Sequence, residues 1–168
     1  MSGADNQQER PCIGAIPAPL GSFLSGFALG ERSFMLVCRI RDHPARSFRI
    51  SAAFNVSQHD RAPLDLFRGT LGCGTMRQAG NGGWYWEVNR PSDLIDRIVP
   101  FFDRFPIVGA KAQDYRCWKE AVLLLAAGRL SDQDYRQVLA LRERMNRGGK
   151  RRHRMDGILR DYTPSPLT

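Results

Sequence analysis

The chain has 168 residues, of which 42% are hydrophobic and 25% charged, a composition typical of one folded domain and not of a disordered chain. Its 25 Lys and Arg residues outnumber its 17 Asp and Glu residues, so its formal charge is +8, which favours a nucleic-acid partner. No apolar run reaches the roughly 18–20 residues of a membrane span, and the N-terminus lacks a signal-peptide pattern, so we expect a cytoplasmic protein without membrane contact.

The first half of the chain predicts two hairpins separated by a helix. Residues 1–17, polar and then interrupted by prolines, are expected to form a flexible N-terminal arm, and a short helix follows over 20–29. Alternating segments at 33–41 and 47–58 predict a first hairpin. We then expect a helix over 62–71 that ends at Gly72, and a second hairpin whose strands are 75–80 and 84–89.

The second half of the chain predicts helices. Ser92 and Asp93 begin a helix that Pro100 must kink or divide, and residues 110–128 form an amphipathic helix. Ser131, with Asp134 three residues later, is expected to cap a helix that continues to Asn146. The order α-β-β-α-β-β-α-α predicts an α+β fold in which helices back one antiparallel sheet.

These boundaries divide the chain into a single domain over 18–146 and a basic tail over 147–168. The sequence RGGKRRHR at the start of the tail has five formal positive charges and no apolar period. The tail is either a solvated, flexible segment or an arm that binds phosphate, and its composition does not decide between them.

The four cysteines, Cys12, Cys38, Cys73 and Cys117, form no CxxC or Cys/His grouping. A zinc site and a disulfide framework are therefore both unsupported, and we expect four reduced thiols.

The two hairpins predict a sheet with one apolar and one polar face, because successive strand residues point to opposite sides. Trp84 and Trp86 are expected in the core, with Tyr85 and Glu87 facing oppositely. Arg, Ser, Thr and Asn side chains can bind phosphates and base edges in a major groove, whereas an ordinary solvated face usually carries more Glu and Lys. The residues predicted to bind DNA on the polar face are Arg39, Arg41, Arg49, Ser51, Asn55, Ser57, Thr75 and Arg77.

The first helix has a face with little side chain, because Ser22, Gly26 and Gly30 recur every fourth residue. Such a face permits either close packing against the chain's own sheet or close pairing with a second helix. Glu31 follows at the negative end of the helix dipole, which is unfavourable for an anion. It is either an exposed turn residue or, if two such helices pair, a ligand of a divalent cation.

The sequence LSGFALGERSF at 24–34 resembles the signature of the LAGLIDADG homing endonucleases. The likeness continues in order through AFNVSQHD at 53–60, LGCGTM at 71–76, VPFFDRFPI at 99–107, and Trp118-Lys119, and so covers about residues 20–146. The resemblance implies the αββαββα fold of that family, whose saddle-shaped sheets lie in the DNA major groove. It also implies that Ser22, Gly26 and Gly30 lie at the interface of a homodimer, since one signature is present.

The resemblance further implies a catalytic set of three residues. Glu31 matches the acid that binds the divalent metal, Mg²⁺ or Mn²⁺, and helps to activate water. Gln58 matches a glutamine at the end of the second strand, and Lys111 matches a basic residue near the start of the fourth helix. The expected activity is hydrolysis of double-stranded DNA at a long pseudo-palindromic site, leaving short 3′ overhangs, in a nucleoid-associated protein.

Two positions depart from the signature. Leu29 occupies its first acidic position, and Arg32 follows the metal-binding acid in place of glycine. These departures favour an alternative on the same fold, a DNA-binding regulator or an RNA maturase that assists intron splicing. A protein–protein module whose basic charge is incidental is a third possibility.

Overall fold

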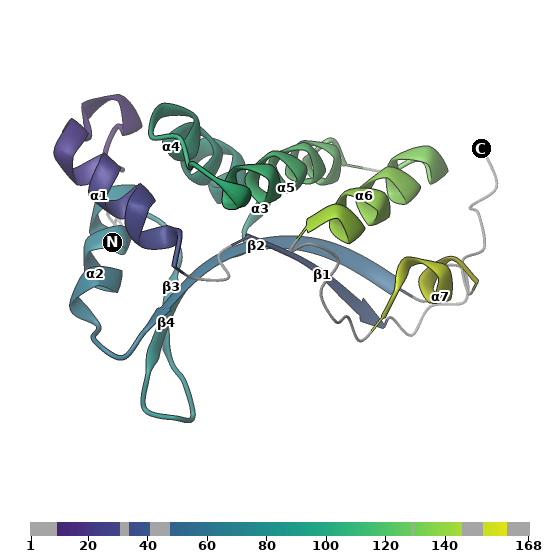
Figure 1. Cartoon of the computed structure of the whole chain (residues 1–168), viewed down its shortest axis with the longest axis horizontal. Helices are drawn as coiled ribbons and strands as arrows, with labels where there is room; N and C mark the ends of the chain where they lie inside the picture. The colour runs from purple at the N-terminus through teal and green to yellow at the C-terminus, as the bar shows by residue number, and fades with distance from the viewer. Residues whose placement is uncertain (1–9, 31–33, 41–47, 129, 146–152, 161–168) are drawn as a thin grey trace, which may run out of the picture.

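The structure is a computed structural model that describes residues 10–30, 34–40, 48–128, 130–145 and 153–160. It combines one four-stranded antiparallel sheet with a layer of helices, as the α+β prediction requires (Figure 1). In the described part of the chain, no helix has the length and apolar character needed to cross a bilayer.

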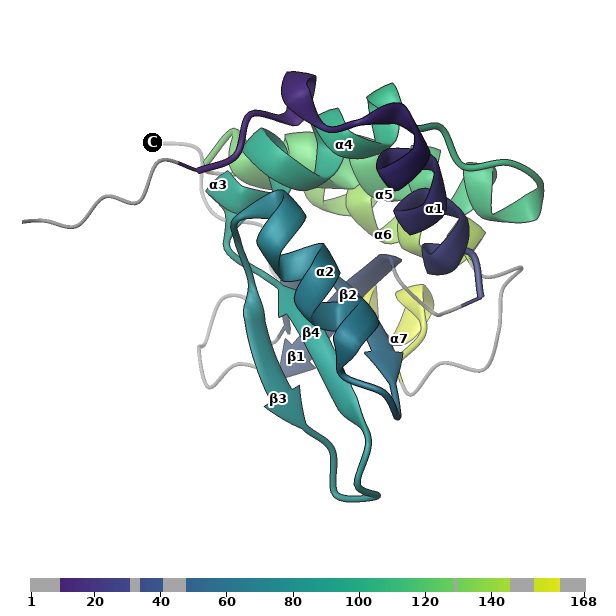
Figure 2. The same cartoon turned by 90° about the vertical axis from the view of Figure 1, so that its left-hand side faces the viewer.

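The sheet has the strand order β1-β2-β4-β3, where the strands are β1 (Phe34–Ile40), β2 (Phe48–Gln58), β3 (Thr75–Gln78) and β4 (Trp84–Val88). β2 is the long strand: residues 48–54 pair with β1 and residues 54–58 pair with β4. Phe54 pairs with Phe34 on one side and with Val88 on the other. β2 therefore arches through the molecule, and the β3–β4 hairpin extends from one end of it (Figures 1 and 2).

The helices cover the apolar face of the sheet in Figure 1, and the order of the main elements is the predicted one. The larger helices are α1 (Ala18–Ala28), α2 (Ala62–Leu71), α4 (Val99–Arg104), α5 (Ala110–Ala126) and α6 (Asp132–Arg144). A short 3₁₀ turn, η1 (Ile13–Ala15), precedes them, and α3 (Pro91–Asp93) leads into the segment before α4.

The core is built around Phe34, the first residue of β1. Its ring centroid lies 5.1 Å from that of Trp118 and 5.3 Å from that of Tyr115, both on α5. The Trp118 indole donates a hydrogen bond of 3.1 Å to the Ala53 carbonyl and so ties α5 to β2. Trp86 is fully buried, as predicted, whereas Trp84 is half-buried beneath the guanidinium of Arg61 at 4.9 Å.

Two helix boundaries have local causes that the sequence already indicated. Ser131 and Asp134 form a complete capping box at the start of α6, with the Ser131 hydroxyl accepting from the Asp134 amide at 3.1 Å. At the end of α2, Gly72 adopts the left-handed conformation with φ 62°, which costs glycine little. α6 ends at Arg144; Asn146, its predicted last residue, lies outside the described residues.

Pro100 divides its helix by a change of helix type. The preceding segment η2 (Leu94–Ile98) is π-helical, and the Val99 amide donates to the Leu94 carbonyl five residues back. α4 then begins at Val99, so Pro100 lies in the first turn of an α-helix, where a missing N–H costs nothing. The predicted division is confirmed as a change from π-helix to α-helix at Val99.

The predicted flexible arm over 1–17 is wrong for residues 10–16, which dock against the helices. Arg10 forms an ion pair of 2.5 Å with the buried Asp93, and the buried Arg97 donates to the carbonyls of Pro11 and Leu71. Ile16 is buried in the core. Charged side chains of α3 and η2 therefore hold this segment in place. The spacing of apolar residues in the sequence gives no sign of such contacts.

The predicted flexible tail over 147–168 is likewise wrong for residues 153–160. These residues include α7 (Met155–Arg160), whose Ile158 is 1% exposed. The His153 ring packs against Phe48 at 5.1 Å between centroids, and its carbonyl accepts a hydrogen bond of 2.8 Å from the buried Arg142. α7 thereby closes the end of the core between α6 and the sheet. The rest of the predicted tail lies outside the described residues.

Candidate nucleic-acid interface

The polar face of the sheet collects the strand residues predicted to bind DNA. Cross-strand partners share a face, so the register alone decides this point. Arg39 is paired with Arg49, and Ser51 lies two residues along β2. At the other end of β2, the paired residues form two rows that cross three strands: Asn55–Glu87–Thr75 and Ser57–Tyr85–Arg77.

The register places seven of the predicted residues on this face, while their binding to DNA stays a prediction: Arg39, Arg49, Ser51, Asn55, Ser57, Thr75 and Arg77. Arg41 lies outside the described residues. The arginines, Ser57 and Thr75 are exposed, while Ser51 and Asn55 are half-buried. The face thus combines exposed arginines with short polar side chains.

The pairing of Arg39 with Arg49 puts two positive charges opposite each other on neighbouring strands. Like charges directly opposite each other on neighbouring strands are destabilising. An anion bound between or beside the two guanidinium groups would relieve that repulsion, and a phosphodiester backbone supplies such anions in a regular array. The geometry is suited to a polyanionic ligand.

Tyr85 and Glu87 also lie on this face, as do Met35, Val37 and Ala53. Tyr85 lies between Ser57 and Arg77, and Glu87 between Asn55 and Thr75. The alternation in WYWEV placed both opposite the tryptophans. Glu87 is an acid among the basic and polar residues of this face, at the middle of the strand rows.

The face of α1 that packs against the rest of the domain is not the face that contains Ser22 and Gly26. Gly21, Leu24, Ser25 and Ala28 are buried, and the Ser25 hydroxyl donates to the Phe105 carbonyl at 2.8 Å. Ser22, Gly26 and Gly30 are exposed, and a Cβ added to Gly26 would meet nothing within 4 Å. Packing against the chain's own sheet therefore does not explain these three residues.

Of the three catalytic residues expected from the resemblance, the structure describes Gln58 and Lys111, which lie on different elements. Glu31 lies outside the described residues, between Gly30 and Phe34. Lys111 is half-buried in the first turn of α5, one turn before Tyr115, whose ring contacts Phe34. Gln58 ends β2, four residues beyond the pairing of Phe54 with Phe34, or roughly 13 Å at the rise of a strand.

The carboxylate of Glu31 is of the type that a hard divalent cation prefers. The helix ends at Ala28 with Leu29 as its C-cap, so its negative dipole end is directed towards the segment that contains Glu31. Carboxylate and carbonyl oxygens are the ligands that Mg²⁺ and Mn²⁺ prefer. Among the residues that the structure describes, no cluster of three His, Cys, Asp or Glu side chains offers a competing site.

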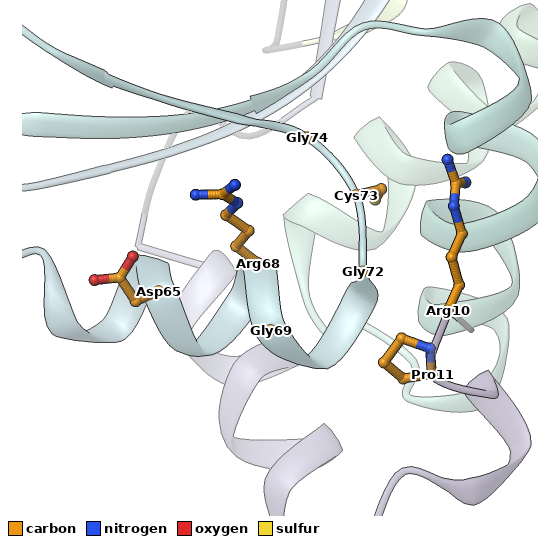
Figure 3. A pocket seen from close by; sticks show the side chains of 8 residues that line it. All are labelled: Arg10, Pro11, Asp65, Arg68, Gly69, Gly72, Cys73 and Gly74. Atoms are coloured by element: carbon orange, nitrogen blue, oxygen red, sulfur yellow. The ribbon is translucent and has the colours of Figure 1, made fainter. Parts of the chain in front are cut away.

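A pocket of about 570 Å³ lies on another part of the surface, between the end of α2 and the docked N-terminal segment (Figure 3). Its acidic and basic side chains include Arg10, already paired with Asp93, and Asp65, paired with Arg61 at 3.0 Å. Burial, and then the charge of Asp93, raise the pKa of the Cys73 thiol to about 12, so this thiol is no nucleophile at neutral pH. Neither Gln58 nor Lys111 lines the pocket.

The comparisons with known proteins agree with this geometry. Residues 24–122 match the family described as LAGLIDADG endonuclease. A protein of Neurospora crassa, "Probable intron-encoded endonuclease 2", is 29% identical over 109 residues, which cover 62% of this chain and 22% of that protein. The chain spans less than a quarter of the length of the curated relatives it matches.

Solved structures extend the match to three dimensions. Meganuclease I-SmaMI, bound to uncleaveable DNA with a TTGT central four, is 29% identical with a TM-score of 0.70, over 80% of this chain and 47% of that one. Meganuclease I-CpaMI, bound to uncleaved DNA, is 25% identical with the same TM-score of 0.70, over 77% and 45%. The family match covers more than half of the chain and agrees with the αββαββα order of the elements, so this chain belongs to the LAGLIDADG endonuclease family.

Proposed function

We propose that the chain is a site-specific DNA endonuclease that cuts both strands of a long pseudo-palindromic duplex and leaves short 3′ overhangs. The observation that carries the proposal is the polar sheet face, on which seven predicted DNA-binding residues lie together. Family membership supports the same ligand, since the similar structures of I-SmaMI and I-CpaMI contain DNA. A cytoplasmic, nucleoid-associated location stays a prediction.

The proposed active unit contains two domains of this kind. This chain matches 47% and 45% of the two meganuclease chains compared above, so each is about twice as long as the matched domain. The exposed Ser22, Gly26 and Gly30 would let α1 approach α1 of a second copy closely. The resulting homodimer has two-fold symmetry, and its DNA site is accordingly pseudo-palindromic.

In the proposed mechanism, Glu31 of each copy would hold a divalent cation, Mg²⁺ or Mn²⁺. The similar protein I-SmaMI has been seen bound to uncleaved DNA in the presence of calcium ions. A bound cation of this type stabilises charge on the attacking and leaving oxygens of a phosphodiester. The Gln58 amide orients the attacking water by a hydrogen bond, and the Lys111 ammonium stabilises negative charge on the scissile phosphate.

A second function on the same fold is a protein that binds nucleic acid without cutting it, either a DNA-binding regulator or an RNA maturase. The observation that favours it is Leu29, which stands at the first acidic position and packs half-buried against the core. A carboxylate is thereby replaced by a packing residue at the end of α1.

The test is incubation of the purified chain with a randomised duplex library, in Mg²⁺ and separately in Ca²⁺, followed by sequencing of cut ends and bound duplexes. The endonuclease predicts uniform short 3′ overhangs within a pseudo-palindrome in Mg²⁺. Glu31→Gln should abolish cutting and keep binding, while Glu120→Gln on α5 makes the same charge change away from the site. Enriched duplexes that are never cut would instead support the regulator or the maturase.

A further inference from the structure

Glu87 lies at the centre of the polar sheet face, paired with Asn55 on β2 and with Thr75 on β3. Because β4 alternates, its neighbours Trp86 and Val88 point into the core, so Glu87 points to the polar side. Glu87 is half-buried. Along β4 it lies two residues from Tyr85, the partner of Arg77. An acid in this place opposes the attraction of the surface for DNA, unless it makes a contact that a neutral or basic residue cannot make.

The Glu87 carboxylate accepts a hydrogen bond from a neutral amide. In the described part of the chain, its recorded partner is the Asn89 amide, which donates to Glu87 Oε1 at 2.9 Å. Asn89 is the first residue after β4, and its bond fixes the orientation of the Glu87 carboxylate. The bond uses one oxygen, and a carboxylate has a second oxygen that can accept another hydrogen bond.

An ionised carboxylate can bind only those groups of DNA that donate a hydrogen bond. It only accepts hydrogen bonds, so phosphate oxygens, the N7 and O6 atoms of guanine and the O4 atom of thymine all repel it. The donors in the major groove are the amino groups of cytosine and adenine. Adenine presents its N7 acceptor beside that amino group, whereas cytosine presents the amino group without such an acceptor.

We infer that Glu87, oriented by Asn89, is a specificity-determining residue that selects cytosine at one position of each half-site. The inference rests on the proposed function, since it concerns which base the same surface recognises. In this role Glu87 contributes to the sequence preference of the surface. Its negative charge at the same time lowers the affinity of the surface for DNA of any sequence.

The experiment compares wild type, Glu87→Gln, Glu87→Asp and Glu120→Gln in selection from the randomised duplex library in Ca²⁺. We expect wild type to prefer cytosine by about tenfold at one position per half-site, as a single good base contact allows. Glu87→Gln should change that preference to adenine, because an amide pairs with adenine N6 and N7. Glu87→Asp should weaken the cytosine preference, and Glu120→Gln should leave it intact.

The outcomes separate this inference from the proposed function. If wild type binds duplexes and Glu87→Gln selects the same bases at every position, Glu87 does not determine specificity. If the position that responds to Glu87→Gln is adenine or another base in wild type, the cytosine assignment is wrong. If wild type binds no duplex in a salt-dependent manner, the proposed function itself fails together with the inference.

Discussion

The ring of Phe105 fills the space beside Gly21, because a Cβ at Gly21 would lie 2.2 Å from the Phe105 Cζ atom. Gly26, on the same helix, has no atom within 4 Å of its own added Cβ, leaving aside the helix's own nearby backbone. The two glycines of α1 therefore have different functions. Gly21 permits contact with the helical layer, and Gly26 belongs to the face that we propose for a second copy.

Alanine at these two positions should change stability in opposite directions. Gly21→Ala should lower the free energy of unfolding by about 1–3 kcal/mol, since it overpacks a filled site. Gly26→Ala should raise it by up to about 1 kcal/mol, since alanine favours a helix. Urea unfolding of the isolated protein measures both changes. Equal destabilisation by the two substitutions would show that Gly26 is also packed within the chain.

Leucine at position 26 should prevent assembly without unfolding the chain. Its side chain has room in one copy but would separate two α1 helices that pack through their small residues. Sedimentation with and without a bound duplex reports the number of chains in the complex. Gly69→Leu on α2 is the matched control, since a Cβ at Gly69 also meets nothing within 4 Å. Unchanged assembly in Gly26→Leu would remove this face from the interface.

Alanine at Arg49 or Arg77 should weaken DNA binding or change base preference. If an arginine contacts a phosphate, its loss lowers affinity for all sequences and reduces the slope of log K against log salt concentration by about 0.9. If it contacts a base, the preference at one position relaxes. Arg116→Ala, on an exposed part of α5, controls for the change of net charge. Variants that match wild type in affinity, salt slope and base preference would show that the polar face does not bind DNA.

Alkaline pH should destabilise the fold through Cys73. Burial raises the pKa of this thiol from 9.0 to about 12, so between these values the unfolded chain has lost a proton that the folded chain keeps. The free energy of unfolding therefore falls as pH rises, by up to about 1.4 kcal/mol per pH unit. The stability of Cys73→Ala should fall less steeply over this range in urea unfolding. Equal slopes would mean that the Cys73 thiol ionises equally in both states.

Removal of the buried side chain of α7 should destabilise the whole domain. Ile158→Ala should cost about 2–5 kcal/mol, as expected for a large aliphatic residue in a core. Leu159→Ala, at a half-buried neighbour, should cost less. Thermal unfolding of the full chain measures both. If Ile158→Ala is as stable as wild type, α7 contributes nothing to the core.

The strands and most helices could be predicted from the sequence, because the residues that recur at strand or helix spacing are the ones buried in the core. The face on which Asn55 lies, opposite its partner Glu87 on β4, follows from the same alternation that buries Phe54 and Val56. Ser131 and Gly72 marked helix ends through chemistry that acts over three or four residues. These features depend on neighbours along the chain, so the sequence contains the information directly.

The parts that were not predicted depend on contacts between distant residues. Arg97 donates to Leu71 and Pro11, and Arg142 donates to Leu36 and His153. A buried arginine that binds backbone carbonyls looks, in the sequence, like an ordinary surface cation. For that reason the docked N-terminal segment and α7 were both expected to be loose. Within the site, the signal for Glu87 was present in the alternation of β4, but the weight of the surrounding basic residues obscured it.

Phe54 has a consequence for how the specificity of this surface can be changed. It is the residue at which β2 passes from one partner strand to the other, so Arg39 and Arg49 belong to one arm of the sheet and the rows through Glu87 and Tyr85 to the other. Substitutions in one arm leave the strand pairing of the other arm untouched. For the proposed endonuclease, we therefore expect that the target site can be altered in two blocks, each selected separately and then combined in one chain.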